Sequence, residues 1–149
     1  VAIYCTLFQL SGLIGLIALI FINKLCIRMQ ILLIFFSSIG LFGFIGTWYL
    51  PKELLAFFVI CLGISVAVCF TLILTLIGLK TSDPKTTASL SGMVQTIGYI
   101  IAAIGPFFAG MLLNHLHTWN YGIYMLIVAS ILEIFFAYII GKEKNNINY

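Results

Sequence analysis

The sequence predicts an all-α fold, a polytopic bundle of helices integral to a membrane. Of its 149 residues, 63% are hydrophobic and only 7% are charged. A soluble domain is nearer half apolar and a quarter charged, and this chain has too few polar groups to cover a water-facing surface. Its apolar segments are also continuous and about as long as the roughly 20 residues that a helix needs to cross the hydrocarbon layer. A β-barrel would instead show alternating segments of about ten residues.

Five apolar segments have this length, and short polar joints separate them. We expect each segment to form one helix, because lipid offers no hydrogen-bonding partner to free backbone amides. We interpret the whole chain, residues 1–149, as a single transmembrane domain. The predicted spans are approximately residues 2–22, 30–50, 54–79, 88–113 and 121–141, followed by a polar tail over 142–149.

The basic residues in the joints predict how the chain is oriented. Cytoplasmic joints of membrane proteins are enriched in Lys and Arg. We therefore expect the first joint, the third joint and the C-terminal tail to face the cytoplasm, with Lys52 alone on the outside. The residues predicted to lie on the cytoplasmic side are Lys24, Arg28, Lys80, Lys85, Lys142 and Lys144.

The third joint and the start of the fourth span read "KTSDPKTTASLSG", residues 80–92. Pro84 is expected to end the preceding helix, since proline has no backbone N–H and clashes within a helix interior. Thr86, Thr87 or Ser89 is then predicted to cap the next helix, because Ser and Thr are favoured at that position.

The fourth span carries an unusual polar stripe within "SGMVQTIGYIIAAIGPFFAG", residues 91–110. At 3.6 residues per turn, Gln95, Tyr99 and Pro106 share one side of the helix. Gly98 and Gly105 lie on an overlapping stripe of small residues, a pattern that lets helices approach closely in lipid. Pro106 leaves the carbonyl of the residue four positions earlier unbonded, so it predicts a bending point beside Gly105.

Two interpretations of Gln95 and Tyr99 remain open. A glutamine facing lipid would cost on the order of a few kcal/mol, so it requires a polar partner or a wet cavity. The two residues could tie neighbouring helices together, or they could line the path of a solute. We favour the solute path.

Glu133 is the one acidic residue within a predicted span. It lies nine residues before Lys142, roughly 13 Å from the inner end of the helix. An ionised carboxylate at that depth is costly, so such residues tend to be functional or paired. Glu133 could couple transport to a proton, but a neutral structural acid, or one paired outside this chain, is the favoured interpretation.

Weaker polar signals lie in the first and third spans, at Gln9, Ser11, Ser65, Thr71 and Thr75. For the hydroxyl groups we favour bonds to the carbonyls of their own helix, as is common in membrane helices. In the second span, glycines recur at every third position, and we interpret them as packing sites. They are Gly40, Gly43 and Gly46.

Several functional classes are not supported by the sequence. The basic residues are scattered, so no nucleic-acid surface is expected. The four cysteines contain no C-x-x-C pair and are interpreted as small packing residues, with only a weak acylation signal at Cys26. His115 and His117 lie two apart without a nearby acid or cysteine, which disfavours a metal site. No hydrolase, zincin or phosphate-loop motif is found. We therefore expect no enzymatic activity and no cofactor.

The segment "LSGMVQTIGYIIAAIGPFFAGML", residues 90–112, resembles the eleventh helix of the major facilitator superfamily. It is most similar to the branch of cyanate permeases and 2-nitroimidazole transporters. "LFQLSGLIGLIALIFINK", residues 7–24, is similar to the eighth helix of that branch. The residues of the fourth span that fit the pattern are Ser91, Gly92, Met93, Gln95, Gly98, Tyr99, Ala102, Ala103, Gly105, Pro106 and Gly110.

This resemblance implies a partial C-terminal half of a major-facilitator fold. The five spans would be helices eight to twelve of a twelve-helix transporter, and the opening Val1 within an apolar segment indicates that an upstream part is missing. Solute would bind near the midplane between the halves. By position in the family, the candidates that line the cavity are Gln9, Thr71, Thr75, Gln95 and Tyr99.

The resemblance further implies transport of a small solute, such as a small anion or a nitroimidazole-like compound, by alternating access. The expected partners are the lipid bilayer, the solute, and the missing N-terminal half with the seventh helix. The expected location is the plasma membrane of a bacterium, with a cytoplasmic C-terminus. The alternatives are a non-transporting membrane subunit or assembly protein, and an inert truncated fragment.

Overall fold

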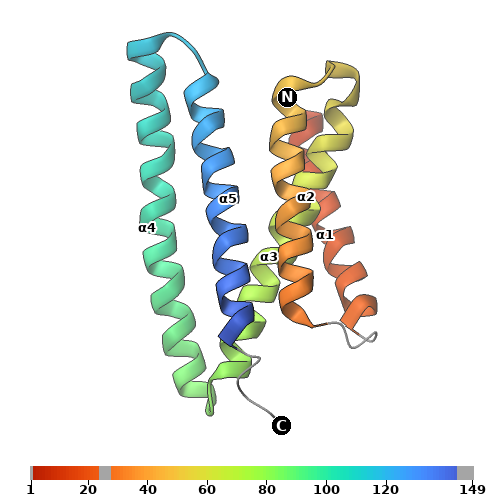
Figure 1. Cartoon of the computed structure of the whole chain (residues 1–149), viewed down its shortest axis with the longest axis vertical. Helices are drawn as coiled ribbons and strands as arrows, with labels where there is room; N and C mark the ends of the chain where they lie inside the picture. The colour runs from red at the N-terminus through yellow and green to blue at the C-terminus, as the bar shows by residue number, and fades with distance from the viewer. Residues whose placement is uncertain (1, 24–27, 144–149) are drawn as a thin grey trace. The chain divides into compact units, whose positions relative to one another are not determined.

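The computed structural model describes residues 2–23 and 28–143, and within these ranges it contains helices and no strand (Figure 1). All five α-helices are long and apolar enough to cross a membrane. The predicted all-α membrane helix bundle is therefore confirmed as a class. The elements are α1 (Ala2–Asn23), α2 (Met29–Tyr49), the 3₁₀ turn η1 (Lys52–Leu54), α3 (Leu55–Lys80), α4 (Pro84–Leu116) and α5 (Asn120–Glu143).

Some predictions concern residues that the structure does not describe. Lys24 and Cys26 in the first joint and residues 144–149 of the tail lie outside the described residues, as do the side chains of residues 141–143. The remaining chain forms two compact units, and α3 and α5 contribute to both. Of the described residues, the first unit contains 2–23, 28–72 and 126–143, and the second contains 73–125.

In the first unit, α1 and α3 approach each other through small residues. Gly63 of α3 lies against the Ser11 hydroxyl and the backbone carbonyl of Phe8, so that a Cβ atom there would overlap both. From the other side, a Cβ atom on Gly12 would lie 3.2 Å from Cβ of Ala67. Close backbone approach of this kind is how helices associate in lipid, where hydrophobicity alone does not drive them together.

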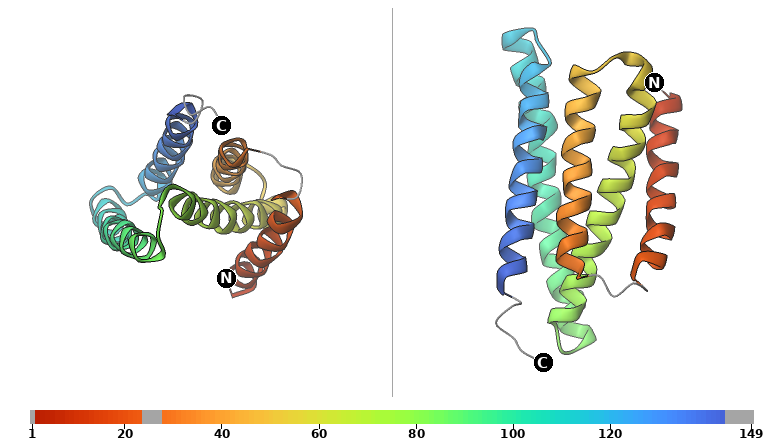
Figure 2. Two further views of the ribbon diagram at one scale, coloured as in Figure 1. Left: turned by 90° about the horizontal axis from the view of Figure 1, so that it is seen from below. Right: turned by 45° about the vertical axis from the view of Figure 1, so that its right-hand side comes forward.

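The contact between α2 and α3 uses the glycines at every third position of α2. A Cβ atom on Gly46 would overlap the ring of Phe58, and one on Gly43 would lie 2.8 Å from Cγ of Leu62. Gly40 faces Ser65 in the same way. Figure 2 shows α1 and α2 alongside α3. The prediction that these three glycines are packing sites is confirmed.

In the second unit, a tight turn connects α3 to α4. The side chain of Asp83 accepts a hydrogen bond of 2.9 Å from the backbone N–H of Thr86, and the hydroxyls of Thr81 and Thr87 are bonded to each other. Asp83 is therefore the N-cap of α4 and Pro84 its first residue. The prediction of a cap at Thr86, Thr87 or Ser89 is wrong. Proline is favoured at the first helical position, where its missing N–H costs nothing, so the residue before it becomes the cap.

Helix α4 continues through Pro106 as one element and ends at His117 (Figure 1). His117 has a φ of 51°, and its N–H bonds to the carbonyl of Leu113 at 2.8 Å. This left-handed residue closes the helix in the way that glycine usually does. Beyond the turn, a Cβ atom on Gly122 of α5 would lie 3.9 Å from Cβ of Ala109, so the two helices stay close together here.

Candidate functional site

The polar stripe of α4 lies on a helix that the described chain leaves largely uncovered. In the most apolar stretch of α4 no residue is buried, whereas 44% of the corresponding stretch of α2 is buried. Gln95 is half-buried, and Tyr99 is 65% exposed. A Cβ atom added at Gly98 or Gly105 would meet no atom within 4 Å. The close-packing role of these glycines and the bending role of Pro106 thus stay predictions.

The other cavity candidates are spread along the chain. Gln9 is exposed on α1, and the Thr71 hydroxyl donates to the carbonyl of Ala67 within α3 at 2.9 Å. Gln9 and Thr71 belong to the first unit, while Thr75, Gln95 and Tyr99 belong to the second. Their participation in one cavity therefore also stays a prediction.

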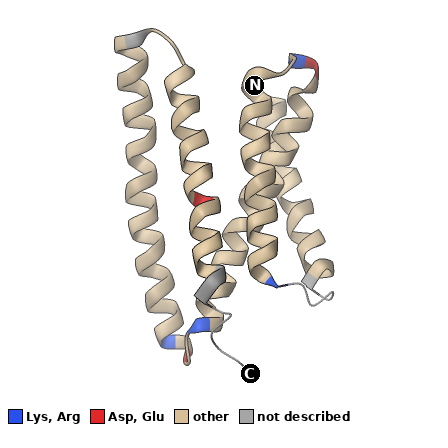
Figure 3. Ribbon diagram, viewed as in Figure 1, with Lys and Arg blue, Asp and Glu red and all other residues tan. Residues whose placement is uncertain are grey.

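Glu133 lies within a hydrogen-bonded cluster that joins three helices of the first unit. Figure 3 shows Lys and Arg near helix ends and an acidic side chain part-way along α5. Glu133 lies part-way along this helix, between Asn120 and Glu143. The Ser37 hydroxyl of α2 donates to Oε1 of Glu133 at 3.1 Å, and it lies 3.5 Å from Sγ of Cys69 on α3. Ser37 is 1% exposed and Cys69 is 3% exposed. The carboxyl group thus has buried polar neighbours, although no basic side chain is among them.

Ser65 extends this cluster along α3. Its hydroxyl donates a bond of 2.7 Å to the carbonyl of Phe36 on α2 and also interacts with the thiol of Cys69. We predicted that Ser65 would bond to its own helix, and this prediction is wrong. The close approach at Gly40 places the α2 backbone within reach of Ser65, so the bond forms between helices. For Ser11 and Thr71 the prediction is confirmed, because each bonds to a carbonyl of its own helix.

Sequence reasoning overlooked Ser37, although a signal for it exists. Ser37 lies nine residues after Arg28, and Glu133 lies nine residues before Lys142. If both basic residues mark the inner end of their helices, then Ser37 and Glu133 lie at the same depth, roughly 13 Å into the membrane. Counting depth from the basic residues would have placed them at one level, although it would not have separated Ser37 from Ser38.

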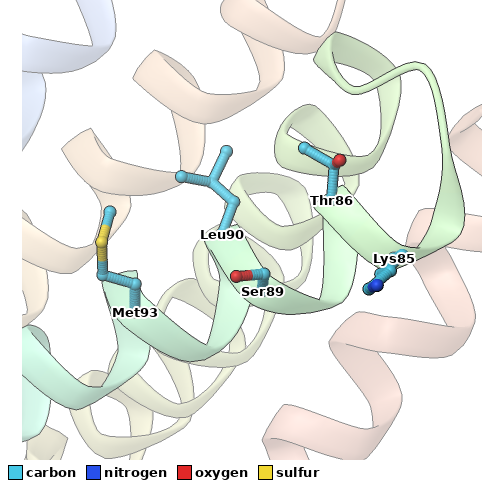
Figure 4. A pocket seen from close by; sticks show the side chains of 5 residues that line it. All are labelled: Lys85, Thr86, Ser89, Leu90 and Met93. Atoms are coloured by element: carbon cyan, nitrogen blue, oxygen red, sulfur yellow. The ribbon is translucent and has the colours of Figure 1, made fainter.

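A shallow hollow of about 380 Å³ runs along the first turns of α4 (Figure 4). It does not include Gln95 or Tyr99. Its lining changes from charged and hydroxyl-bearing side chains at the start of the helix to apolar side chains further along. The lining residues are Lys85, Thr86, Ser89, Leu90 and Met93.

The residues that could ligate a metal are dispersed. Among the residues that the structure describes, no group of three His, Cys, Asp or Glu side chains comes together as a metal site. His115 and His117 are both exposed at the end of α4.

Part of the chain is similar in sequence to known transport proteins. The chain is 44% identical over 94 residues to "Uncharacterized transporter YycB" of Bacillus subtilis (strain 168), which covers 63% of this chain. It is 33% identical over 100 residues, or 67% of the chain, to "Putative anionic 4-hydroxy-benzoate permease" of Thauera aromatica. It is also 29% identical over 102 residues, or 68% of the chain, to the 2-nitroimidazole transporter of Escherichia coli (strain K12).

These matches cover only part of each relative. The matched segments span 23%, 60% and 26% of the lengths of the three proteins, in the same order. No protein-family model matches the chain, and no solved structure matches it. The chain is also 30% identical over 101 residues, or 65% of its length, to "Cyanate transport protein CynX" of Escherichia coli (strain K12), of which it covers 26%. It is thus similar over about two thirds of its length to membrane transporters, and the predicted resemblance to the cyanate and 2-nitroimidazole transporter branch of the major facilitator superfamily is confirmed.

Proposed function

We propose that this chain forms part of a secondary transporter that moves a small solute across a membrane by alternating access. The observation that carries this proposal is the 44% identity to a transporter over 94 residues. The other two relatives are named as a permease and a transporter, and none of the three is named as an enzyme. We infer accordingly that this chain is a transporter component and has no catalytic activity of its own.

We infer that Gln95 and Tyr99 of α4 contact the solute. Both side chains can donate and accept hydrogen bonds, and an amide in an apolar medium requires such a partner. No residue in the most apolar stretch of α4 is buried, and this supports the inference, because further helices could pack against α4 and complete a cavity. The seventh helix and the N-terminal half of the transporter would supply them, since the chain matches only part of its relatives.

The solute class that we propose is small and planar. The relatives are named for an anionic 4-hydroxy-benzoate and for 2-nitroimidazole, both of which are flat rings with polar substituents. In the described helices, Lys and Arg lie near the ends (Figure 3). Within α4 the basic residue of this kind is Lys85, ten positions before Gln95. If the solute is an anion, we therefore expect its positively charged partner on the helices that complete the cavity.

We further propose that the protein is a multi-pass component of a bacterial plasma membrane and that its C-terminus is cytoplasmic. The basic residues support this orientation, since all but Lys52 fall in alternate joints and in the tail. The turn at Asp83 between α3 and α4, with Lys80 and Lys85 on either side, would then be a cytoplasmic turn.

Uptake measurements test the proposal. Cells that express the full-length protein containing this sequence would be supplied with radiolabelled 4-hydroxybenzoate, 2-nitroimidazole or cyanate. We expect uptake of at least one of them. The variant Gln95→Ala is expected to lower that uptake by about 5- to 100-fold, which corresponds to one lost hydrogen bond of about 1–3 kcal/mol.

The matched control is Thr96→Ala, one position along the same helix. The Thr96 hydroxyl donates to the carbonyl of Gly92 at 2.8 Å, within α4 itself, so its loss should leave uptake unchanged. If Gln95→Ala transports normally at normal membrane levels, then Gln95 only joins helices. If the parent takes up none of the three compounds, the alternative of a non-transporting subunit is favoured.

A further inference from the structure

We propose that Glu133 is a proton-binding site and that Ser37, Cys69 and Ser65 form a hydrogen-bonded relay that stabilises it in both charge states. The inference that Glu133 binds a proton rests on the geometry of the first unit. The assignment of the proton as the coupling ion rests in addition on the transport function proposed above.

The relay is a continuous set of polar contacts across α2, α3 and α5. Ser37 Oγ contacts Oε1 of Glu133 at 3.1 Å and Sγ of Cys69 at 3.5 Å. Ser65 lies four positions before Cys69 on α3, so their side chains are neighbours on one face of the helix. Ser65 is anchored at the far end by its 2.7 Å bond to the carbonyl of Phe36. Ser37, Ser65 and Cys69 are all buried, so these bonds form away from solvent.

When Glu133 is ionised, its oxygens can only accept hydrogen bonds. The one hydroxyl proton of Ser37 is then directed to Oε1, as the structure shows. The thiol proton of Cys69 is directed to the oxygen of Ser37 or to the carboxylate, and Ser65 donates to Phe36. Every buried donor and acceptor in the cluster is satisfied in this arrangement.

When Glu133 is protonated, the direction of the bonds reverses. The carboxyl group becomes a donor to Ser37, and Ser37 then turns its proton to the sulfur of Cys69. Cys69 in turn donates to the oxygen of Ser65, whose bond to Phe36 is unchanged. Again no buried polar group is left without a partner. The switch requires only rotation of hydroxyl and thiol protons, so the helices need not move for the proton to bind.

The surroundings of Glu133 suit a site that gains and loses a proton. Among the described residues, the titratable side chain that faces it is Cys69 from α3. Helix α2 has no titratable residue between Arg28 and Tyr49, and α5 has none between Tyr124 and Tyr138 other than Glu133 itself. Glu133 is exposed among the described residues, whereas Ser37, Cys69 and Ser65 are buried.

Infrared spectroscopy tests the relay directly. The full-length protein would be reconstituted in liposomes with every cysteine except Cys69 replaced by alanine, and pH difference spectra would be recorded without solute. We expect a carboxyl C=O band that is lost in Glu133→Gln. We also expect the S–H stretching band of Cys69 to shift with the same pH midpoint as that carboxyl band, because the thiol changes its acceptor.

Two adjacent serines give the matched pair of variants. Ser37→Ala is expected to abolish the pH-dependent shift of the S–H band, while Ser38→Ala should preserve it, because the Ser38 hydroxyl bonds to Ile34 of its own helix at 2.8 Å. A carboxyl band that titrates while the S–H band stays constant would overturn the relay. Absence of any pH-dependent band assignable to Glu133 would overturn the proton site.

Labelling provides a second measurement that does not depend on the folding of a Ser37 variant. Dicyclohexylcarbodiimide reacts with protonated carboxyl groups in apolar surroundings, so mass spectrometry should find Glu133 labelled at acidic pH and unlabelled at alkaline pH. Constant labelling at every pH would contradict the proposal. Neither measurement requires transport, so a protein that binds the proton yet moves no solute would count against the proposed function alone. In a working transporter, an inward proton gradient should stimulate uptake, and Glu133→Gln should lose this stimulation.

Discussion

Gly63 of α3 lies against the backbone carbonyl of Phe8 on α1, with no room for a side chain between the two helices. Backbone atoms cannot rotate aside as a flexible side chain can, so this contact fixes the distance between α1 and α3. We predict that Gly63→Ala forces the helices apart and destabilises the chain by about 1–3 kcal/mol, the usual cost of overpacking. Thermal unfolding in detergent would measure it.

The control for this prediction is Gly92→Ala in α4, where a Cβ atom meets nothing within 4 Å. Alanine there should be neutral or stabilising by up to about 1 kcal/mol, because glycine in a helix interior is less favourable than alanine. Equal thermal stability of the two variants would show that the contact between α1 and α3 is not as tight as described.

The bond from Ser37 to Glu133 links α2 to α5 within the membrane. We predict that Ser37→Ala lowers the free energy of unfolding by about 0.5–2 kcal/mol, the range for a hydrogen bond between membrane helices. Ser38→Ala should change it by less than about 0.5 kcal/mol, as is usual for substitutions away from a packed contact. Denaturation by a harsh detergent, followed by circular dichroism, measures both. If Ser38→Ala were the more damaging variant, the described rotation of α2 would be wrong.

His117 adopts a left-handed conformation at the end of α4, with a φ of 51°. A residue with a Cβ atom pays a conformational cost there that glycine does not. We predict that His117→Gly stabilises the chain by up to about 1 kcal/mol, because the roughly 1–2 kcal/mol cost of a left-handed residue is removed and the greater freedom of glycine in the unfolded state offsets part of it. The β-branched His117→Val should destabilise the chain. The melting temperatures of the two variants should move in opposite directions. Destabilisation by glycine would indicate that the His117 side chain makes a contact of its own.

Asp83 should give the turn before α4 a dependence on pH. The hydrogen bonds that its carboxyl group accepts from Thr86, from the hydroxyl first and then from the backbone N–H, hold the pKa of Asp83 below its usual value. Since the pKa is lower in the folded state, the stabilisation is fully present above the unfolded pKa and is lost as pH falls through the folded pKa. We expect the melting temperature to fall over that acidic range.

The variant Asp83→Asn isolates this effect, because asparagine caps helices about as well as aspartate and does not titrate. Its melting temperature should lack the contribution of Asp83 to the acidic decline. Asp83→Ala should be less stable than the parent at neutral pH, since it leaves the N–H of Thr86 without its cap. An unchanged acidic decline in the Asn variant would assign the pH dependence to another group.

The helices of this chain are encoded locally in its sequence, whereas the side-chain contacts between them depend on how each helix is rotated. The helices were predictable because an apolar segment in lipid has no alternative way to satisfy its backbone. The packing role of Gly40, Gly43 and Gly46 was predictable because a regular spacing places small residues on one side of a helix. The cap at Asp83 was missed because Pro84 was considered only as the end of one helix and not as the start of the next.

The cluster around Glu133 was not predictable in the same way. Whether a serine bonds to its own helix or to a neighbour depends on how the helix is rotated, and nothing local distinguishes Ser37 from Ser38. The partners Ser37 and Glu133 are also separated by 96 positions, so no short pattern links them. For the cavity candidates Gln9, Thr71, Thr75, Gln95 and Tyr99, the described neighbours do not decide whether they share one cavity.

The glycine contacts between α2 and α3 also bear on biogenesis. Gly46 and Phe58 flank the short connection between α2 and α3. The two helices can therefore pack against each other as soon as α3 has left the ribosome and entered the bilayer. The acid on α5 arrives last, after every other helix of the chain has been synthesised. In a nascent chain, Ser37 would therefore lie in a folded hairpin of α2 and α3 before Glu133 is synthesised. The hydrogen bond between Ser37 and Glu133 would then be among the last contacts of the first unit to form.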